Sequence, residues 1–101
     1  MKTKEELIKL GIDGFKADEI VLLEEKMLTQ AVRFTFRKKD GTIREALGTL
    51  MRSLMRLDNG KLWEPVGVVK PEPENIVRYF DLEKLMWRSF TCTEFIAITE
   101  V

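Results

Sequence analysis

The hydrophobic pattern of the chain changes near residue 31, and this change limits the possible folds more than any other feature. In the segment 31–39, AVRFTFRKK, the apolar side chains of Val32, Phe34 and Phe36 alternate with polar ones. An alternation with a period of two is typical of a strand with one buried face. Asp40-Gly41 follows, and glycine enters the positive-φ region of a tight turn without steric cost. The sequence therefore predicts a β-hairpin in the middle of the chain.

The second strand of this hairpin is expected from Thr42 to about Leu50. A two-residue turn and a three-residue turn with a bulge shift its register by one residue, which exchanges the two faces of the strand. Either Arg44 or Glu45 then joins the exposed face. The sequence leaves both registers open.

Two short helices are predicted before the hairpin. Thr3 and Glu6 have the spacing of a capping box, which predicts a helix that ends at about Leu10. Asp18 is a candidate N-cap for a second helix over 19–29, because its carboxylate can accept a free amide hydrogen of the first turn. An apolar stripe and an opposite polar side indicate that this helix is amphipathic. The stripe consists of Ile20, Leu23 and Met27, and the polar side of Glu24, Glu25 and Lys26.

The rest of the chain is predicted to form a long connection followed by three more strands. Residues 51–75 contain three prolines, which disfavour a central strand, and could form a helical turn only at their start. Strands are predicted over 75–82, 87–92 and 95–99, with a turn at 83–86. Two helices followed by five antiparallel strands, without βαβ alternation, predict an α+β, mainly β fold. The expected architecture is a small five-stranded antiparallel SH3/Sm-like barrel, with a half-open α+β roll as the alternative.

The segment 77–90, VRYFDLEKLMWRSF, places four aromatic residues in one predicted hairpin. Alternation assigns Phe80 and Phe90 to the core and the arginines of the segment to the surface. Tyr79 and Trp87 stay open between core packing and a stacking surface for a ligand.

A chain of 101 residues can build one modest core, so we expect one domain over 1–101, with a helical segment, 1–30, and a barrel, 31–101. No apolar run is long enough to cross a bilayer. The N-terminal residues MKTKEEL lack the apolar part of a secretory signal, and the single cysteine, Cys92, can form no internal disulfide. These features predict a cytoplasmic protein that does not enter a membrane.

Two motifs resemble a known family. The segment 34–44, FTFRKKDGTIR, is similar to the first hairpin of WYL-type domains, and Asp81 followed by the segment 87–90, WRSF, is similar to their last hairpin. Together they resemble the short, stand-alone branch of the family, an Sm-like SH3 β-barrel of uncharacterised function that is frequent in gut bacteria and their phages. The resemblance covers about 30–98. It implies a regulatory role in which the barrel senses a ligand or a nucleic-acid fragment. The cations that match are Arg37, Lys39, Arg44 and Arg88.

The residue types present argue against catalysis. The chain has no histidine, which removes the usual general base and the commonest metal ligand. Cys92 has apolar and hydroxyl neighbours, which favours a buried structural thiol over a nucleophile. The acid pairs at 81 and 83 and at 72 and 74 fall in turns or loops, where solvated carboxylates are common. We therefore expect no enzyme activity, no cofactor and no metal site.

The charge distribution indicates where a partner would bind. The net charge is zero, but residues 31–61 carry eight basic and three acidic side chains. A local basic surface attracts anions even on a neutral protein, because fields beyond about 10 Å are screened. The predicted binding site consists of Arg33, Arg37, Lys39, Arg44, Trp87 and Arg88.

Three kinds of partner are compatible with this site. Cations beside planar rings suit nucleic acid, whereas the arginines alone suit an anionic small-molecule ligand. The third is a protein partner or a homo-oligomer, formed through the open edges of a small barrel. Salt dependence separates the first from the third, because nucleic-acid binding should weaken steeply with salt whereas a protein interface should barely respond.

Overall fold

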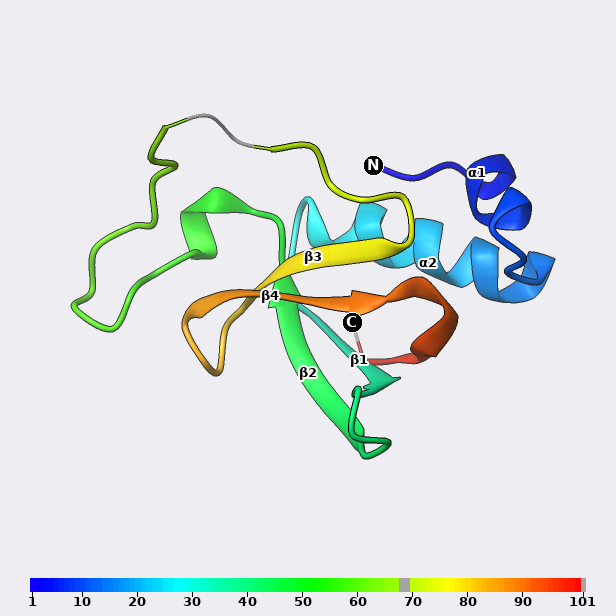
Figure 1. Ribbon diagram of the computed structural model, residues 1–101. Helices are drawn as coiled ribbons and strands as arrows, with labels where there is room; N and C mark the ends of the chain where they lie inside the picture. The colour runs from blue at the N-terminus through cyan, green and yellow to red at the C-terminus, as the bar shows by residue number, and fades with distance from the viewer. Residues whose placement is uncertain (68–69, 101) are drawn as a thin grey trace.

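A computed structural model describes residues 1–67 and 70–100 and contains two helices followed by five strands. The helices are α1 (Lys4–Lys9) and α2 (Gly14–Met27). The strands are β1 (Val32–Arg37), β2 (Ile43–Thr49), β3 (Ile76–Asp81), β4 (Met86–Thr91) and β5 (Phe95–Glu100). They form one antiparallel sheet in the order β4-β3-β2-β1-β5 (Figure 1). The predicted architecture is therefore confirmed.

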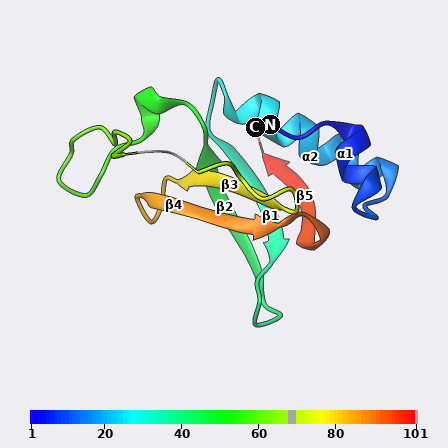
Figure 2. The ribbon, with the colours of Figure 1, turned by 45° about the horizontal axis from the view of Figure 1, so that its top comes forward.

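The sheet is strongly curved but not closed. The strands β4 and β5 are its two edges, although one 3₁₀ turn, Cys92–Glu94, is all that separates them in the sequence. The helices cover one end of the sheet, where α2 packs against β5 and β1, while the β1–β2 hairpin projects away from them (Figure 2). The barrel thus has an open side, and this side is bordered by the β1–β2 hairpin and β4.

The β1–β2 turn takes the three-residue form. The amide of Gly41, at φ +88°, donates to the carbonyl of Lys38 (2.9 Å), and the Lys38 amide donates to the carbonyl of Thr42 (2.8 Å). A type I turn followed by a residue in the left-handed region gives this bulged hairpin. Phe36 consequently lies opposite Arg44, and the exposed Glu45 opposite Thr35. Arg44 therefore belongs to the core-facing side of β2.

The second helix begins earlier than the sequence predicted. The Thr3 cap is confirmed, but Asp13 rather than Asp18 caps α2, and its carboxylate accepts from the amide of Lys16 (2.9 Å). Starting at Gly14 places Ala17 in the core. Asp18 instead lies on the surface and pairs with Lys4 (3.2 Å). An aspartate inside the first turns of a helix is thus indistinguishable from a cap by sequence alone.

Helices and sheet share one hydrophobic core. The predicted stripe of α2 is fully buried, as expected, and packs with the inner faces of the strands. Glu24 was expected on the polar side, but it is only 2% exposed, and this prediction is wrong. The reason is the N-terminal segment, which lies over it: the Lys2 amide donates to the Glu24 carboxylate (3.2 Å), and the Lys2 ammonium pairs with Glu72. Burial raises the pKa of Glu24.

The β3–β4 hairpin buries different residues on its two faces. Phe80 and Phe90 are both buried, as predicted, but Phe80 lies opposite Trp87, whereas Phe90 lies opposite Val77 and faces the main core. Tyr79 is fully buried in that core. Cys92 is buried too, as predicted, and burial raises the pKa of its thiol to about 11. No helix in the described ranges has the length and apolar character that a membrane span needs.

Candidate anion-binding groove

A groove of about 800 Å³ lies between the tip of the β1–β2 hairpin and β4. The strand β2 pairs with β3 at Gly48 and Thr49, so the outer part of the β1–β2 hairpin extends beyond this pairing, as Figure 2 shows. The groove lies between that outer part and β4. Ligand pockets for small molecules commonly have volumes of about 300–1,000 Å³. The groove is lined by Phe36, Arg37, Lys38, Lys39, Asp40, Gly41, Arg44, Ile76, Tyr79, Arg88, Ser89, Phe90, Thr91 and Glu94.

The lining is predominantly cationic. Five of the lining residues are basic and two are acidic. Within the described ranges, Arg37, Lys38, Lys39 and Arg88 are exposed and form no ion pair. The nearby Asp40 is occupied by the turn, where it accepts from the amide (3.0 Å) and hydroxyl (2.6 Å) of Thr42, and these bonds lower its pKa. The free cations therefore give the groove a positive potential.

Aromatic residues form the floor of the groove. The rings of Phe36 and Phe90 stack with centroids 5.1 Å apart, and the Tyr79 ring lies beside both. The two phenylalanines are only 5% and 4% exposed, so they offer little ring surface to a ligand. The Tyr79 hydroxyl is buried and has no hydrogen-bond partner among the described residues. Burial raises the pKa of this phenol to about 12, which keeps it protonated, and hence a donor, at neutral pH.

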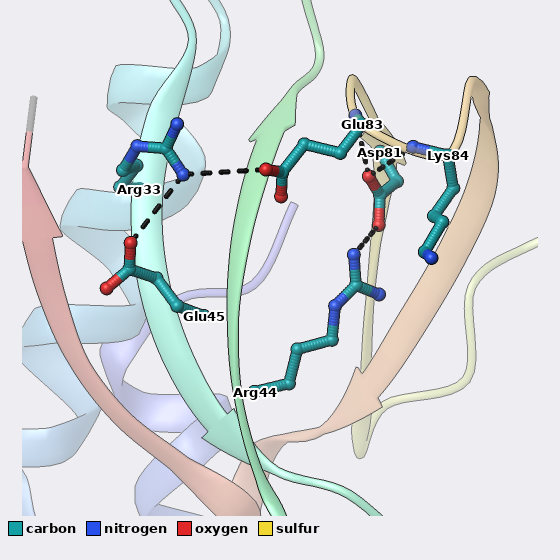
Figure 3. A network of polar contacts seen from close by, with 6 residues as sticks. All are labelled: Arg33, Arg44, Glu45, Asp81, Glu83 and Lys84. Carbon is teal, nitrogen blue, oxygen red and sulfur yellow. Dashed lines mark hydrogen bonds and ion pairs between the residues drawn. The ribbon is translucent and has the colours of Figure 1, made fainter.

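An ion pair holds one of the arginines in place. Arg44 reaches from β2 to the Asp81 carboxylate on β3 (2.6 Å), and the second oxygen of Asp81 accepts from the turn amides of Glu83 and Lys84, both at 2.9 Å (Figure 3). Asp81 is fully buried, so the expectation of a solvated turn carboxylate is wrong for this residue. Its burial follows from the distant partner and the two amides, which replace water. Arg44 consequently contributes a fixed guanidinium to the groove.

The structure separates the residues of the predicted site into two groups. Arg37, Lys39, Arg44 and Arg88 all line the groove. Arg33 shares a strand face with Arg37 but lies four residues away, near the start of β1, where it pairs with Glu45 (3.6 Å) and Glu83 (3.8 Å), as Figure 3 shows.

Trp87 also lies away from the groove. It packs edge-on against Phe80 and Trp63, with ring centroids 5.9 and 5.2 Å away, on the opposite face of the β3–β4 hairpin from Tyr79. The predicted set omitted Lys38 and the Tyr79 hydroxyl. The Tyr79 hydroxyl could have been included because Tyr79 lies opposite Arg88 in the hairpin.

Comparison with known proteins places the chain in a family. Residues 20–96 match the family model WYL_2, described as an Sm-like SH3 beta-barrel fold. Searches of curated proteins and of solved structures give no match. The matched segment includes most of α2, every residue that lines the groove, the strands β1 to β4 and the first two residues of β5. Because the match covers well over half of the chain, the protein belongs to the WYL_2 family of Sm-like SH3 β-barrels.

Proposed function

We propose that this chain is a small, non-catalytic binding protein, with an accessory or regulatory role, that holds an anionic ligand in the groove. The observation that carries the proposal is a set of donors around the groove that find no partner in the part of the chain that the structure describes. Arg37, Lys39 and Arg88 have no acidic partner among the described residues, and the Tyr79 hydroxyl has no acceptor there. Charge-assisted hydrogen bonds to an anion would satisfy them together.

The non-catalytic part of the proposal rests on residue types. The chain has no histidine, and its only cysteine is buried with a raised pKa. The groove presents mainly cations and a protonated phenol, which suit the binding of an anion, and one of its two carboxylates, Asp40, is held by the turn. A cytoplasmic location is part of the same proposal, since a single cysteine is in keeping with a reducing compartment.

Single-stranded nucleic acid is the second candidate ligand. The exposed run from Arg37 to Lys39 at the hairpin tip favours it, because consecutive cations can follow a phosphate backbone. The other requirement, an exposed stacking surface, is poorly met in the groove: Phe36 and Phe90 are nearly buried, and Trp87 is on the other face of its hairpin. A compact anion therefore fits the groove better than a strand does.

A pair of arginine variants tests the proposal. Arg88→Gln removes a groove cation, whereas Arg33→Gln removes a cation outside the groove. Calorimetric titration with inorganic phosphate, and with a single strand of about ten nucleotides, is expected to show about tenfold weaker binding for Arg88→Gln, since hydrogen bonds to charged groups contribute about 1.5–3 kcal/mol. Arg33→Gln should bind as the parent does.

Two results would contradict the proposal. One is that neither phosphate nor the strand binds the parent protein. The other is that Arg33→Gln weakens binding as much as Arg88→Gln does, because the site would then lie outside the groove. Repeating the titration at higher salt separates the two ligands: binding of the strand should fall much more steeply than binding of phosphate.

A further inference from the structure

The donors of the groove lie in two tiers. Lys38 and Lys39 at the hairpin tip are exposed and form the outer tier. Tyr79, which is fully buried, forms the inner tier, and the exposed Arg88 is its direct partner across the β3–β4 hairpin. Side chains that are directly opposite in an antiparallel pair have Cβ atoms about 5 Å apart and point to the same side of the sheet. The Arg88 guanidinium and the Tyr79 hydroxyl can therefore reach one common group.

Residues 1–67 and 70–100 supply no acceptor for the Tyr79 hydroxyl. The nearest charged neighbours of the phenol are Arg44, Asp81 and Arg88. The arginines are donors only, and the Asp81 carboxylate accepts from Arg44 and from the turn amides but forms no hydrogen bond with the phenol. A buried donor without an acceptor destabilises a fold, and a functional role is one of the reasons for which such a group is retained. The acceptor for this hydroxyl is accordingly expected to come from outside the chain.

The depth of the hydroxyl restricts what can reach it. Phe36 and Phe90 flank the Tyr79 ring on the floor of the groove, and the Tyr79 hydroxyl is buried, so a broad group is kept away from it and a narrow end group suits the position better. An internal phosphodiester carries a sugar on each side and would stay at the outer tier. A phosphate monoester ends a molecule, carries a charge of about −1.5 to −2 at neutral pH and has three oxygens to share among the donors.

From these contacts we infer that the groove recognises a small molecule of about nucleotide size through a terminal phosphate monoester. The phosphate lies between Arg88 and the Tyr79 hydroxyl, and the rest of the ligand lies under the hairpin tip in a groove of about 800 Å³. This inference rests on the proposed function, because it specifies the ligand of the same site. The inference goes beyond the proposed function because it assigns to the Tyr79 hydroxyl the distinction between a terminal phosphate and an internal one.

The test compares two ligands that differ at one phosphate oxygen. Adenosine 5′-monophosphate and its methyl ester, a phosphodiester, are titrated calorimetrically into the parent protein and into Tyr79→Phe. The parent is expected to bind the monoester at least tenfold more tightly than the diester. Tyr79→Phe should lose about tenfold for the monoester and stay unchanged for the diester. The variant keeps the buried ring and removes only an unpaired hydroxyl, so it should fold, which a thermal melt verifies. Lys61→Gln, on an exposed loop outside the groove, is the matched surface control and should bind as the parent does.

The outcomes separate this inference from the proposed function. Equal binding of monoester and diester, or a Tyr79→Phe protein that binds the monoester like the parent, overturns the inference and leaves the proposed anion site in place. If neither compound nor inorganic phosphate binds the parent, both are wrong. Phenyl phosphate, included as a monoester with a different body, should show the same dependence on Tyr79, and its failure to do so would also overturn the inference.

Discussion

Replacing Asp81 with alanine is expected to lower the free energy of unfolding by about 3 kcal/mol, because breaking one side of a buried ion pair leaves the other charge poorly solvated. The Asp81 side chain is fully buried, and its partner, Arg44, has a side chain only 16% exposed. The substitution also removes the acceptor for two turn amides, those of Glu83 and Lys84. The expected loss lies at the lower end of the usual range of about 3–5 kcal/mol because the Arg44 side chain keeps some contact with water. Equilibrium unfolding in urea gives the midpoint and slope that measure the loss.

The matched control for this substitution lies in the same turn. Glu83→Ala removes a carboxylate that is half exposed and whose contact with Arg33, at 3.8 Å, is a loose one. Exposed ion pairs contribute about 0–1 kcal/mol, so this variant should unfold at nearly the urea concentration of the parent. If Asp81→Ala is no less stable than Glu83→Ala, the Arg44–Asp81 pair does not hold the groove together in the way described.

Gly48→Ala is expected to be the second large effect, with a loss of about 2 kcal/mol in the free energy of unfolding. A Cβ at this position would lie 2.8 Å from Cδ2 of Tyr79 and 3.0 Å from Cε1 of Phe34, and both distances are shorter than an ordinary van der Waals contact between carbon atoms. Both rings are fully buried and contact each other edge to face, with centroids 5.0 Å apart, so neither can move without disturbing the core. Overpacking of this kind costs about 1–3 kcal/mol. Urea denaturation again provides the measurement.

A second glycine offers a control of opposite sign. A Cβ at Gly14, the first residue of α2, would meet only Cε of Lys4 at 4.0 Å, which is an ordinary contact. Alanine favours a helix over glycine by up to about 1 kcal/mol, so Gly14→Ala should be neutral or stabilising. Equal stability of the two variants would mean that the Tyr79 ring is free to shift, and that the floor of the groove is not fixed.

Much of the fold could be predicted from local sequence, but its long-range contacts could not. The alternation from Val32 to Phe36 and the Asp40-Gly41 turn were sufficient for the central hairpin. Its register depended on one residue of turn length, which the side chains leave open. Asp81 was expected in water because it precedes a turn, and its partner Arg44 is 37 residues away. No local pattern reports a contact between such distant positions.

The candidate site shows the same division. The cations of the hairpin tip were predicted because charge is visible in a sequence, and four of the six predicted residues line the groove. Arg33 was grouped with them because it shares a strand face with Arg37, but residues four apart on a strand are separated by about 13 Å, and Glu45 and Glu83 occupy Arg33. The buried Tyr79 hydroxyl became apparent only when the partners of its neighbours were known.

Amide chemical shifts report directly whether an anion binds in the groove. Titrating ¹⁵N-labelled protein with adenosine 5′-monophosphate should shift the amides of Lys38, Lys39, Tyr79 and Arg88 along a saturable curve, while that of Arg33 stays in place. Shifts centred on Arg33, or the absence of any saturable shift, would contradict the account.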